Sequence, residues 1–191
     1  FFQILDRING KYYVDSLGVK EFWVVNVHSK IVIPTESNMS SPTTPNISNS
    51  LRREDDMPKY SKTYYMYNYN MGRTGNEAVH NHGHQLESMC TYVAEKQDGD
   101  SKLFWRDFVG YNSIFPNLRN GDTHHTPNSA SDYDYFNSTP QESDILDWIP
   151  SGGKSTQVSK TTWDTLHYNW LSHLYPNEDN LFYLPNAESN W

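Results

Sequence analysis

The chain contains a single cysteine, Cys90, so it cannot form an internal disulfide. The disulfide framework that supports many small secreted domains is therefore excluded. The sequence also lacks the run of roughly 18 apolar residues that a membrane-spanning helix needs, and we expect no membrane span. Basic residues are few, since 15 Lys and Arg stand against 23 Asp and Glu and give a formal net charge of −8. This charge argues against nucleic acid as a partner, because phosphate backbones attract positively charged surfaces.

The length and composition fit one folded domain. A chain of 191 residues, of which 36% are hydrophobic and 15% aromatic, can bury one sizeable core. We therefore expect a single domain over residues 1–191. The opening residues FFQILDRI have the spacing of a helix already under way and lack the basic start of a signal peptide. This start predicts that the domain is part of a longer chain.

The residue patterns predict an α/β fold with long irregular loops. Apolar spacing predicts a helix over residues 1–17, interrupted at Asn9-Gly10. The segments VKEFWVVNV (residues 19–27) and TYYMYNYN (residues 63–70) are rich in β-branched and aromatic residues. Both therefore read as strands, and we expect the first to be buried.

Polar stretches separate the remaining elements. The proline-containing residues 34–59 are expected to form a surface excursion, and residues 112–160 to be mostly irregular. Helices are predicted over residues 75–95 and 161–174, where apolar residues recur at helical spacing. We expect these elements to build a small, partly parallel sheet covered by helices.

The helix predicted over residues 75–95 carries a dense group of ionisable side chains, in GNEAVHNHGHQLE. Thr74 followed by Glu77 fits a capping box, which is a purely structural reason for Glu77. At about 100° per residue, the apolar residues gather on one side: Val79, Leu86, Cys90 and Val93. A second side, roughly 140° away, holds what we name the histidine stripe: Glu77, His80, His84 and Glu87. We expect this stripe to face away from the core.

Two histidines and a carboxylate of the stripe suit a metal ion. His80 and His84 are four residues apart, which places both imidazoles over one patch of helix, and Glu87 follows one turn later. This set predicts a site for zinc or another first-row divalent metal, with a position left for a further ligand or water. The pattern is not that of zincins, because Asn81 stands where HExxH needs glutamate. The alternative is a solvated polar stripe without an ion.

A second group of histidines lies in NGDTHHTPNSASDYDYFN, residues 120–137, which has the composition of a loop. Loops held by a scaffold often carry sites, so His124 or His125 can complete a metal shell begun on the helix. As an alternative, Asp122 and Asp134 are residues that cap turns.

Other conspicuous residues have simpler explanations. His82 lies near the apolar side of the helix and is expected to be packed and hydrogen-bonded, and Cys90 is expected to be a packed thiol. The segment SGGKST (residues 151–156) resembles the end of a phosphate-binding loop, but Trp148 stands where that loop needs glycine. The many tyrosines and tryptophans suit a sugar-stacking surface, and they suit a core equally well.

Three Asn-x-Ser/Thr sequons, at Asn38, Asn46 and Asn137, lie in sequence rich in proline, serine and threonine. They suit a glycosylated extracellular protein. A chain this rich in asparagine, serine and threonine also contains sequons by chance, so both interpretations stay open.

The segments GNEAVHNHGHQLESM, GDTHHTPN, DYDYFN and TLHYNWLSHLYP together resemble a poorly characterised family of extracellular bacterial and fungal proteins. That family has a GHxxE helix, a GxxHxPPN loop, a DYDYxN segment and a WLxHLP helix end. VKEFWVV and ESNM also match it, so the resemblance covers nearly the whole chain. The resemblance implies these site residues: Glu77, His80, His84, Glu87, His124, Glu36, and Asp132 or Asp134. His125 and Thr126 depart from the loop motif, in which an aromatic residue and a proline stand.

Two functions of different kinds follow. The first is a secreted zinc-dependent hydrolase of an extracellular polymer, peptide or glycan, with the ion held by His80, His84 and His124. In it Glu77 or Glu87 serves as general base or further ligand, and residues 34–59 form a lid. The second is a glycosylated structural or adhesive extracellular module, in which the same cluster is a structural metal site or a hydrogen-bonded network.

Overall fold

The computed structural model describes residues 1–27, 36–44, 46–48, 56–71, 76–110, 119–125, 127–131, 137–147, 149 and 151–159. Of residues 76, 77 and 79 it describes the backbone alone. The chain forms two compact units, Phe1–Met89 and Cys90–Trp191. The expectation of a single domain over residues 1–191 stays a prediction. Within the described ranges, no helix is long and apolar enough to cross a membrane.

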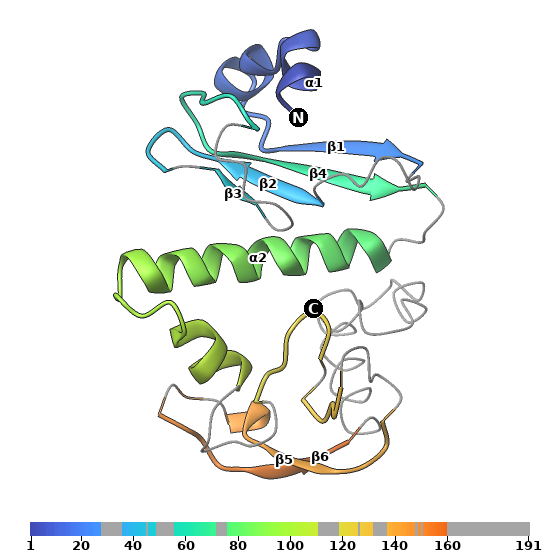
Figure 1. Cartoon of the computed structure of the whole chain (residues 1–191), viewed down its shortest axis with the longest axis vertical. Helices are drawn as coiled ribbons and strands as arrows, with labels where there is room; N and C mark the ends of the chain where they lie inside the picture. The colour runs from blue at the N-terminus through green and yellow to red at the C-terminus, as the bar shows by residue number, and fades with distance from the viewer. Residues whose placement is uncertain are drawn as a thin grey trace. The chain divides into compact units, whose positions relative to one another are not determined.

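The first unit is built around a mixed sheet with the strand order β1-β4-β2-β3 (Figure 1). Its strands are β1 (Glu21–Asn26), β2 (Ser37–Ser40), β3 (Ile47–Ser48) and β4 (Tyr64–Asn70). β1 runs parallel to β4, with Trp23 opposite Tyr67. β2 runs antiparallel to β4, with Asn38 opposite Met66. The predicted α/β class and the small, partly parallel sheet are confirmed.

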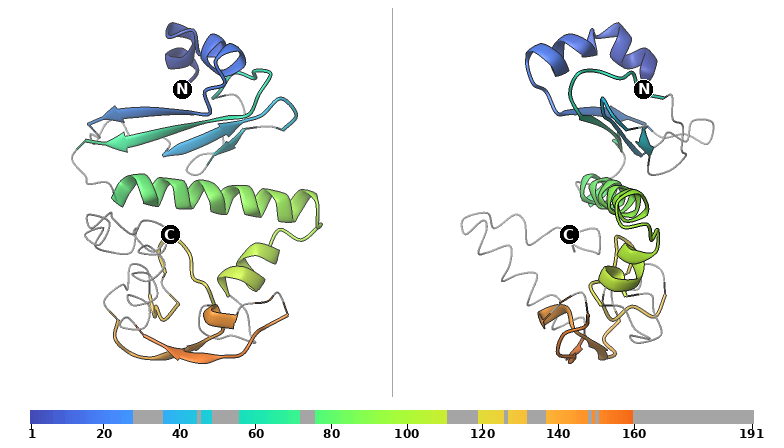
Figure 2. Two further views of the ribbon diagram at one scale, coloured as in Figure 1. Left: turned by 180° about the vertical axis from the view of Figure 1, so that it is seen from behind. Right: turned by 90° about the vertical axis from the view of Figure 1, so that its left-hand side faces the viewer.

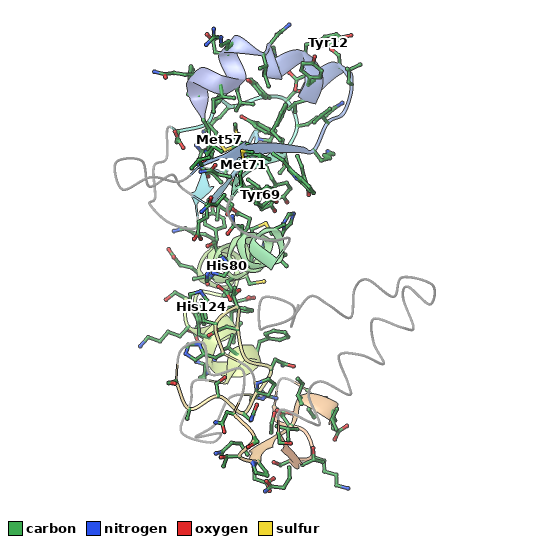
Figure 3. The ribbon with its side chains drawn as sticks, turned by 90° about the vertical axis from the view of Figure 1, so that its right-hand side faces the viewer. Tyr12, Met57, Tyr69, Met71, His80 and His124 are labelled. Carbon is green, nitrogen blue, oxygen red and sulfur yellow. The ribbon has the colours of Figure 1, made fainter. Side chains whose placement is uncertain are left out.

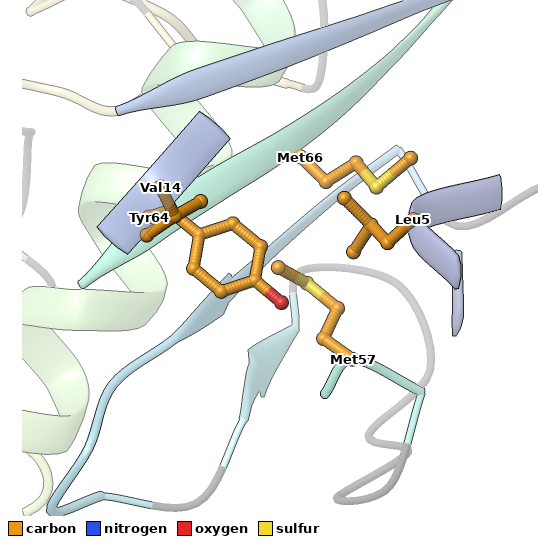
Figure 4. Packing of buried hydrophobic residues seen from close by; sticks show 5 residues of the cluster. All are labelled: Leu5, Val14, Met57, Tyr64 and Met66. Atoms are coloured by element: carbon orange, nitrogen blue, oxygen red, sulfur yellow. The ribbon is translucent and has the colours of Figure 1, made fainter. Parts of the chain in front are cut away.

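One face of this sheet carries the apolar core. The helix α1 (Phe2–Arg7) and the π-helical segment η1 (Tyr12–Ser16) cover that face (Figure 2). The buried side chains between them and the sheet are Leu5, Val14, Met57, Tyr64 and Met66 (Figure 4). The predicted interruption of the first helix is confirmed, because Asn9 has a φ of 57° in the left-handed region that asparagine tolerates.

Asp15 of η1 ties this helical cover to the residues that lead into β4. Its carboxylate accepts hydrogen bonds from Lys11 Nζ (2.5 Å), Ser61 N (2.9 Å) and Ser61 Oγ (2.7 Å). The bond from Lys11, and then that from Ser61, lower the pKa of Asp15 from 3.8 to about 2. A depressed pKa stabilises the fold at pH values above the unfolded pKa, and this contribution is lost as the pH falls through the folded pKa.

We expect the variant Asp15→Asn to be less stable than wild type at pH 7, since the charge that Lys11 contacts is removed. The difference between the two proteins should shrink as the pH falls from about 4 to about 2. Urea unfolding of both proteins at a series of pH values measures this difference. A gap that stays constant down to pH 2 would show that the ionisation of Asp15 does not contribute.

The expectation that residues 19–27 form a buried strand is wrong in part. The strand is present as β1, but Trp23 and Val25 are 59% and 57% exposed. Among the strands that the structure describes, β1 lies at an edge of the sheet and pairs only with β4. An edge strand can therefore carry β-branched and aromatic residues without burying both faces.

The expectation that residues 34–59 form a surface excursion is also wrong in part. Ser37–Ser40 form β2, whose four residues are all buried, and Ile47–Ser48 form β3. The polar side chains of β2 do not predict a strand, but its backbone groups form hydrogen bonds with β4. A lid formed by the whole stretch is not compatible with two strands of the sheet.

The helix α2 (Asn76–Lys96) confirms the helix predicted over residues 75–95. Its predicted orientation is wrong. Leu86 and Val93 are 52% and 42% exposed, whereas the buried side chains of the helix are largely polar: His80, Asn81, Gln85 and Glu87. Cys90, expected to be packed, is exposed as well.

Hydrogen bonds to the sheet backbone explain the orientation of α2. Asn81 Nδ2 donates to the carbonyl of Asn68 (2.9 Å), and Gln85 Nε2 donates to that of Ile47 (3.0 Å). Two buried amides thus donate to backbone carbonyls, so the side of the helix that carries Asn81 and Gln85 faces the sheet with the donor end of each amide satisfied. Thr74 and the side chains of Glu77 and Val79 lie outside the described residues.

The second unit contains short elements: η2 (Phe104–Val109), β5 (Gln141–Ser143), η3 (Ile145–Asp147) and β6 (Thr156–Val158). β5 and β6 pair antiparallel. The described part of residues 112–160 is otherwise irregular, as predicted. The helix predicted over residues 161–174 lies outside the described residues. Arg119 and Asp144 form a buried ion pair in this unit, at 2.6 Å between Nη2 and Oδ2.

Candidate metal centre

His80 and His84 lie one turn apart on α2, as the sequence predicts (Figure 3 labels His80). Their ring centroids are 4.4 Å apart, and the ring planes meet at 85°. His80 is buried, and His84 is partly buried. The helix therefore presents two imidazoles at one place, which is the arrangement that a shared ion requires.

The amide of Asn81 determines which nitrogen of His80 carries the proton. Asn81 Nδ2 faces the carbonyl of Asn68, which can only accept, so the other amide atom, Oδ1, faces His80 Nδ1 at 3.0 Å. This oxygen is an acceptor, and His80 Nδ1 therefore donates to it. The lone pair that can coordinate an ion is then on His80 Nε2.

The carboxylate of Glu87 determines which nitrogen of His84 carries the proton. Glu87 Oε2 lies 2.7 Å from His84 Nδ1, and both side chains are largely buried. An ionised carboxylate only accepts hydrogen bonds, so His84 Nδ1 donates to it and the lone pair is on Nε2. Histidines that bind metals commonly donate their other N–H to a carboxylate or a carbonyl oxygen. Both histidines have this outer partner.

His124 lies in a tight turn of the second unit (Figure 3). Asp122 Oδ1 accepts from the backbone N–H of His124 (2.8 Å) and of His125 (3.0 Å), and it lies 2.9 Å from His125 Nδ1. Asp122 therefore caps the turn, as the structural alternative predicts. Of the two candidate histidines in this loop, His125 is the one that bonds to Asp122 through its ring.

The histidines 80, 84 and 124 form a group that can hold a metal ion. Each of them offers one ligand atom, and the three atoms all lie within 4.8 Å of one another. The ligand set consists of neutral imidazoles, which suits zinc and its first-row neighbours better than magnesium or calcium.

His82 is packed, which confirms the prediction for this residue. Its ring stacks on Tyr67 with centroids 3.9 Å apart, and its Nδ1 lies 2.7 Å from the carbonyl of Ala78. A carbonyl can only accept, so His82 Nδ1 donates to it. His82 thus has a role in packing α2 on β4, and it is absent from the group of three.

The remaining predicted site residues divide between described and undescribed parts of the chain. Glu36 lies just before β2, and its backbone carbonyl accepts a hydrogen bond from Asn68 N at 2.8 Å. Asp132, Asp134 and the side chain of Glu77 lie outside the described residues. The ligand and general-base roles predicted for Glu77 and Glu87 stay predictions.

The structure describes all three sequon asparagines. Asn38 and Asn46 are buried, at 0% and 6% exposed, and their glycosylation stays a prediction. Asn137 Nδ2, the atom that a glycan would join, donates to the carbonyl of Asn128 at 3.2 Å. Glycosylation at Asn137 stays a prediction, and it would have to replace this hydrogen bond.

The sequence matches no family model, and no match was found among curated proteins or solved structures. The resemblance to an extracellular family therefore stays a prediction. The structure also gives a role to Asn81, which in the sequence is notable only for standing where HExxH needs glutamate. A signal was present in the sequence, because Asn81 and Gln85 are amides four residues apart and so share a helix face.

Proposed function

We propose that the chain binds zinc, or another first-row divalent metal, through His80, His84 and His124 and uses it to hydrolyse an extracellular polymer, either glycan or protein. The observation that carries this proposal is the group of three histidine ligand atoms within 4.8 Å of one another. Three imidazoles leave one tetrahedral position for water, and zinc lowers the pKa of such a water toward about 7.

Neighbouring residues orient the two helix histidines for metal binding. Asn81 and Glu87 each occupy an Nδ1, so that both helix histidines offer Nε2 to the ion. The carboxylate of Glu87 also makes the His84 imidazole a stronger ligand, because a negative hydrogen-bond acceptor raises its basicity. In this proposal Glu87 positions His84, and Glu77 is the remaining candidate for a general base.

A closed structural site is the second candidate. His80 and Glu87 are both only 6% exposed. Burial of this kind also suits a stabilising ion in a structural or adhesive extracellular module, because structural zinc sites have no open position. The two candidates differ in whether a small ligand can reach the ion.

The first test is the metal content of the purified protein, measured by mass spectrometry. We expect about one metal ion per chain in wild type and little in His80→Ala, His84→Ala and His124→Ala. His82→Ala and His125→Ala serve as matched controls, since each removes a histidine next to the group of three and should retain the metal. Metal-free wild type that also fails to take up added zinc would sink the proposal.

Cobalt substitution separates the two candidates. Added azide should change the visible spectrum of the cobalt protein if a coordination position is open, as the hydrolase requires. An unchanged spectrum at saturating azide would favour the closed structural site. An activity screen on peptides and glycans is then worthwhile only in the first case.

A further inference from the structure

We propose that Asn81 is a positioning residue that holds His80 in the tautomer whose Nε2 binds the metal. The inference rests on the proposed metal site, and it adds a residue that no motif assigns. Asn81 is fully buried on α2 and bridges two partners: the carbonyl of Asn68 at 2.9 Å and His80 Nδ1 at 3.0 Å.

The Asn68 end of this bridge is fixed by the sheet. Asn68 lies in β4, the strand that pairs with both β1 and β2. Its backbone N–H donates to the carbonyl of Glu36 at 2.8 Å, and its Oδ1 accepts from Asn26 Nδ2 at 2.7 Å. The acceptor that orients Asn81 is thus held by neighbouring strands on both sides.

The amide of Asn81 has one orientation that suits both of its partners. An asparagine amide has one donor end and one acceptor end, and the carbonyl of Asn68 accommodates only the donor. The acceptor end is therefore directed at His80, and a flipped amide would place two oxygens against each other. In a site buried to this degree, such a mismatch costs the free energy of an unpaired polar group.

The orientation of this amide affects metal binding through the tautomer of His80. A neutral imidazole has one proton for two nitrogens, and without an acceptor at Nδ1 either nitrogen can carry it. The fraction of His80 protonated on Nε2 cannot coordinate through that atom, so it reduces the apparent affinity. Asn81 prevents this loss of affinity, because its neutral amide oxygen accepts from His80 Nδ1 and keeps the proton there. Glu87 keeps the proton of His84 on Nδ1 with a charged acceptor, its carboxylate.

The test compares Asn81→Ala with Gln85→Ala as a matched control. Both variants remove a fully buried amide that bonds α2 to a carbonyl of the sheet, but only Asn81 contacts a histidine of the group. Zinc affinity is measured by competition with a chromogenic chelator. We expect Asn81→Ala to weaken zinc binding by about 10- to 100-fold, the range found for lost outer partners of metal-binding histidines. Gln85→Ala should bind zinc as wild type does.

A second measurement does not need the metal. In metal-free protein labelled with ¹⁵N-histidine, two-bond NMR correlations report which ring nitrogen of His80 carries the proton. We expect Nδ1–H in wild type and in Gln85→Ala, and a mixture of tautomers in Asn81→Ala. Asn81→Asp should restore Nδ1–H, because a carboxylate still accepts from His80, while it loses the donor to Asn68. A merely structural role would not produce this rescue of the tautomer.

The outcomes separate this inference from the proposed function. Wild type that binds no zinc but shows an Asn81-dependent Nδ1–H on His80 would refute the metal site and keep the positioning role. An unchanged tautomer in Asn81→Ala, or an equal loss of zinc affinity in Gln85→Ala, would overturn the positioning role. If Asn81→Ala does not fold, the tautomer of His80 in Asn81→Asp decides, because an Nε2–H form there contradicts the inference.

Discussion

Zinc at 100 times its dissociation constant should raise the free energy of unfolding of the wild-type protein by about 2.7 kcal/mol. A ligand that binds the folded chain and not the unfolded chain stabilises it by RT ln(1 + [L]/Kd). His124 is separated from the pair His80 and His84 by about 40 residues of sequence, and that pair shares one patch only when the helix is formed. The unfolded chain therefore has no preformed site, and the stabilisation should appear nearly in full.

His84→Ala should abolish this response at the same zinc concentration. The variant removes one of three ligands and leaves Glu87 without the histidine it contacts. Urea unfolding followed by circular dichroism, with and without zinc, measures the difference in free energy. His82→Ala should lose some stability through the contact with Tyr67 and still respond to zinc.

Two further additions control for unspecific effects of cations. Magnesium prefers oxygen ligands and octahedral geometry, so it should leave the unfolding curve of wild type unchanged. A chelator should return zinc-loaded wild type to the metal-free curve. An equal shift by zinc in wild type and in His84→Ala would contradict the site.

Periodicity predicted the long helix and the aromatic strand well, because both signals are local. Residues 75–95 became α2 (Asn76–Lys96), and residues 63–70 became β4 (Tyr64–Asn70). A helix of 21 residues and a strand of seven, with tyrosines at alternate positions, carry patterns long enough to identify the type of element, whichever face it buries. The same logic identified His80 and His84 as neighbours in space.

The orientation of α2 could not be predicted from the same pattern. Hydrophobic periodicity assumes that the apolar side faces the core, whereas Asn81 and Gln85 turn the polar side toward the sheet. Their partners are carbonyl groups of Asn68 and Ile47, and a sequence does not show which carbonyls a distant strand will present. The buried strand β2 escaped prediction for a related reason, since SNMS is a strand because β4 and β3 pair with it.

Asp144→Asn should lower the free energy of unfolding of the second unit by about 3–5 kcal/mol, the cost of leaving one member of a buried ion pair without its partner. The side chains of Arg119 and Asp144 are 1% and 0% exposed, and Arg119 donates from Nε to Oδ1 (2.9 Å) and from Nη2 to Oδ2 (2.6 Å). Burial alone would raise the pKa of Asp144, but the hydrogen bonds from Arg119 and from Gly153 N–H outweigh it and lower that pKa. The carboxylate is thus charged in the folded chain, and its neutral replacement leaves the guanidinium unbalanced.

Hydrogen exchange of the backbone amides in residues 90–159, together with urea unfolding, measures this loss. Asp100→Asn is the matched control, because Asp100 pairs with Arg106 at 2.7 Å on the surface, with side chains 38% and 42% exposed. Water screens that pair, so its loss should cost far less. The double variant Arg119→Met, Asp144→Leu should be more stable than Asp144→Asn, since it leaves no charge buried. If Asp144→Asn and Asp100→Asn lower the free energy of unfolding equally, the buried ion pair does not stabilise the second unit. If the double variant is as unstable as Asp144→Asn, other hydrogen bonds matter more than the paired charge. These bonds run from Arg119 to the Ile149 carbonyl (2.5 Å) and from Gly153 N–H to Asp144 (2.8 Å).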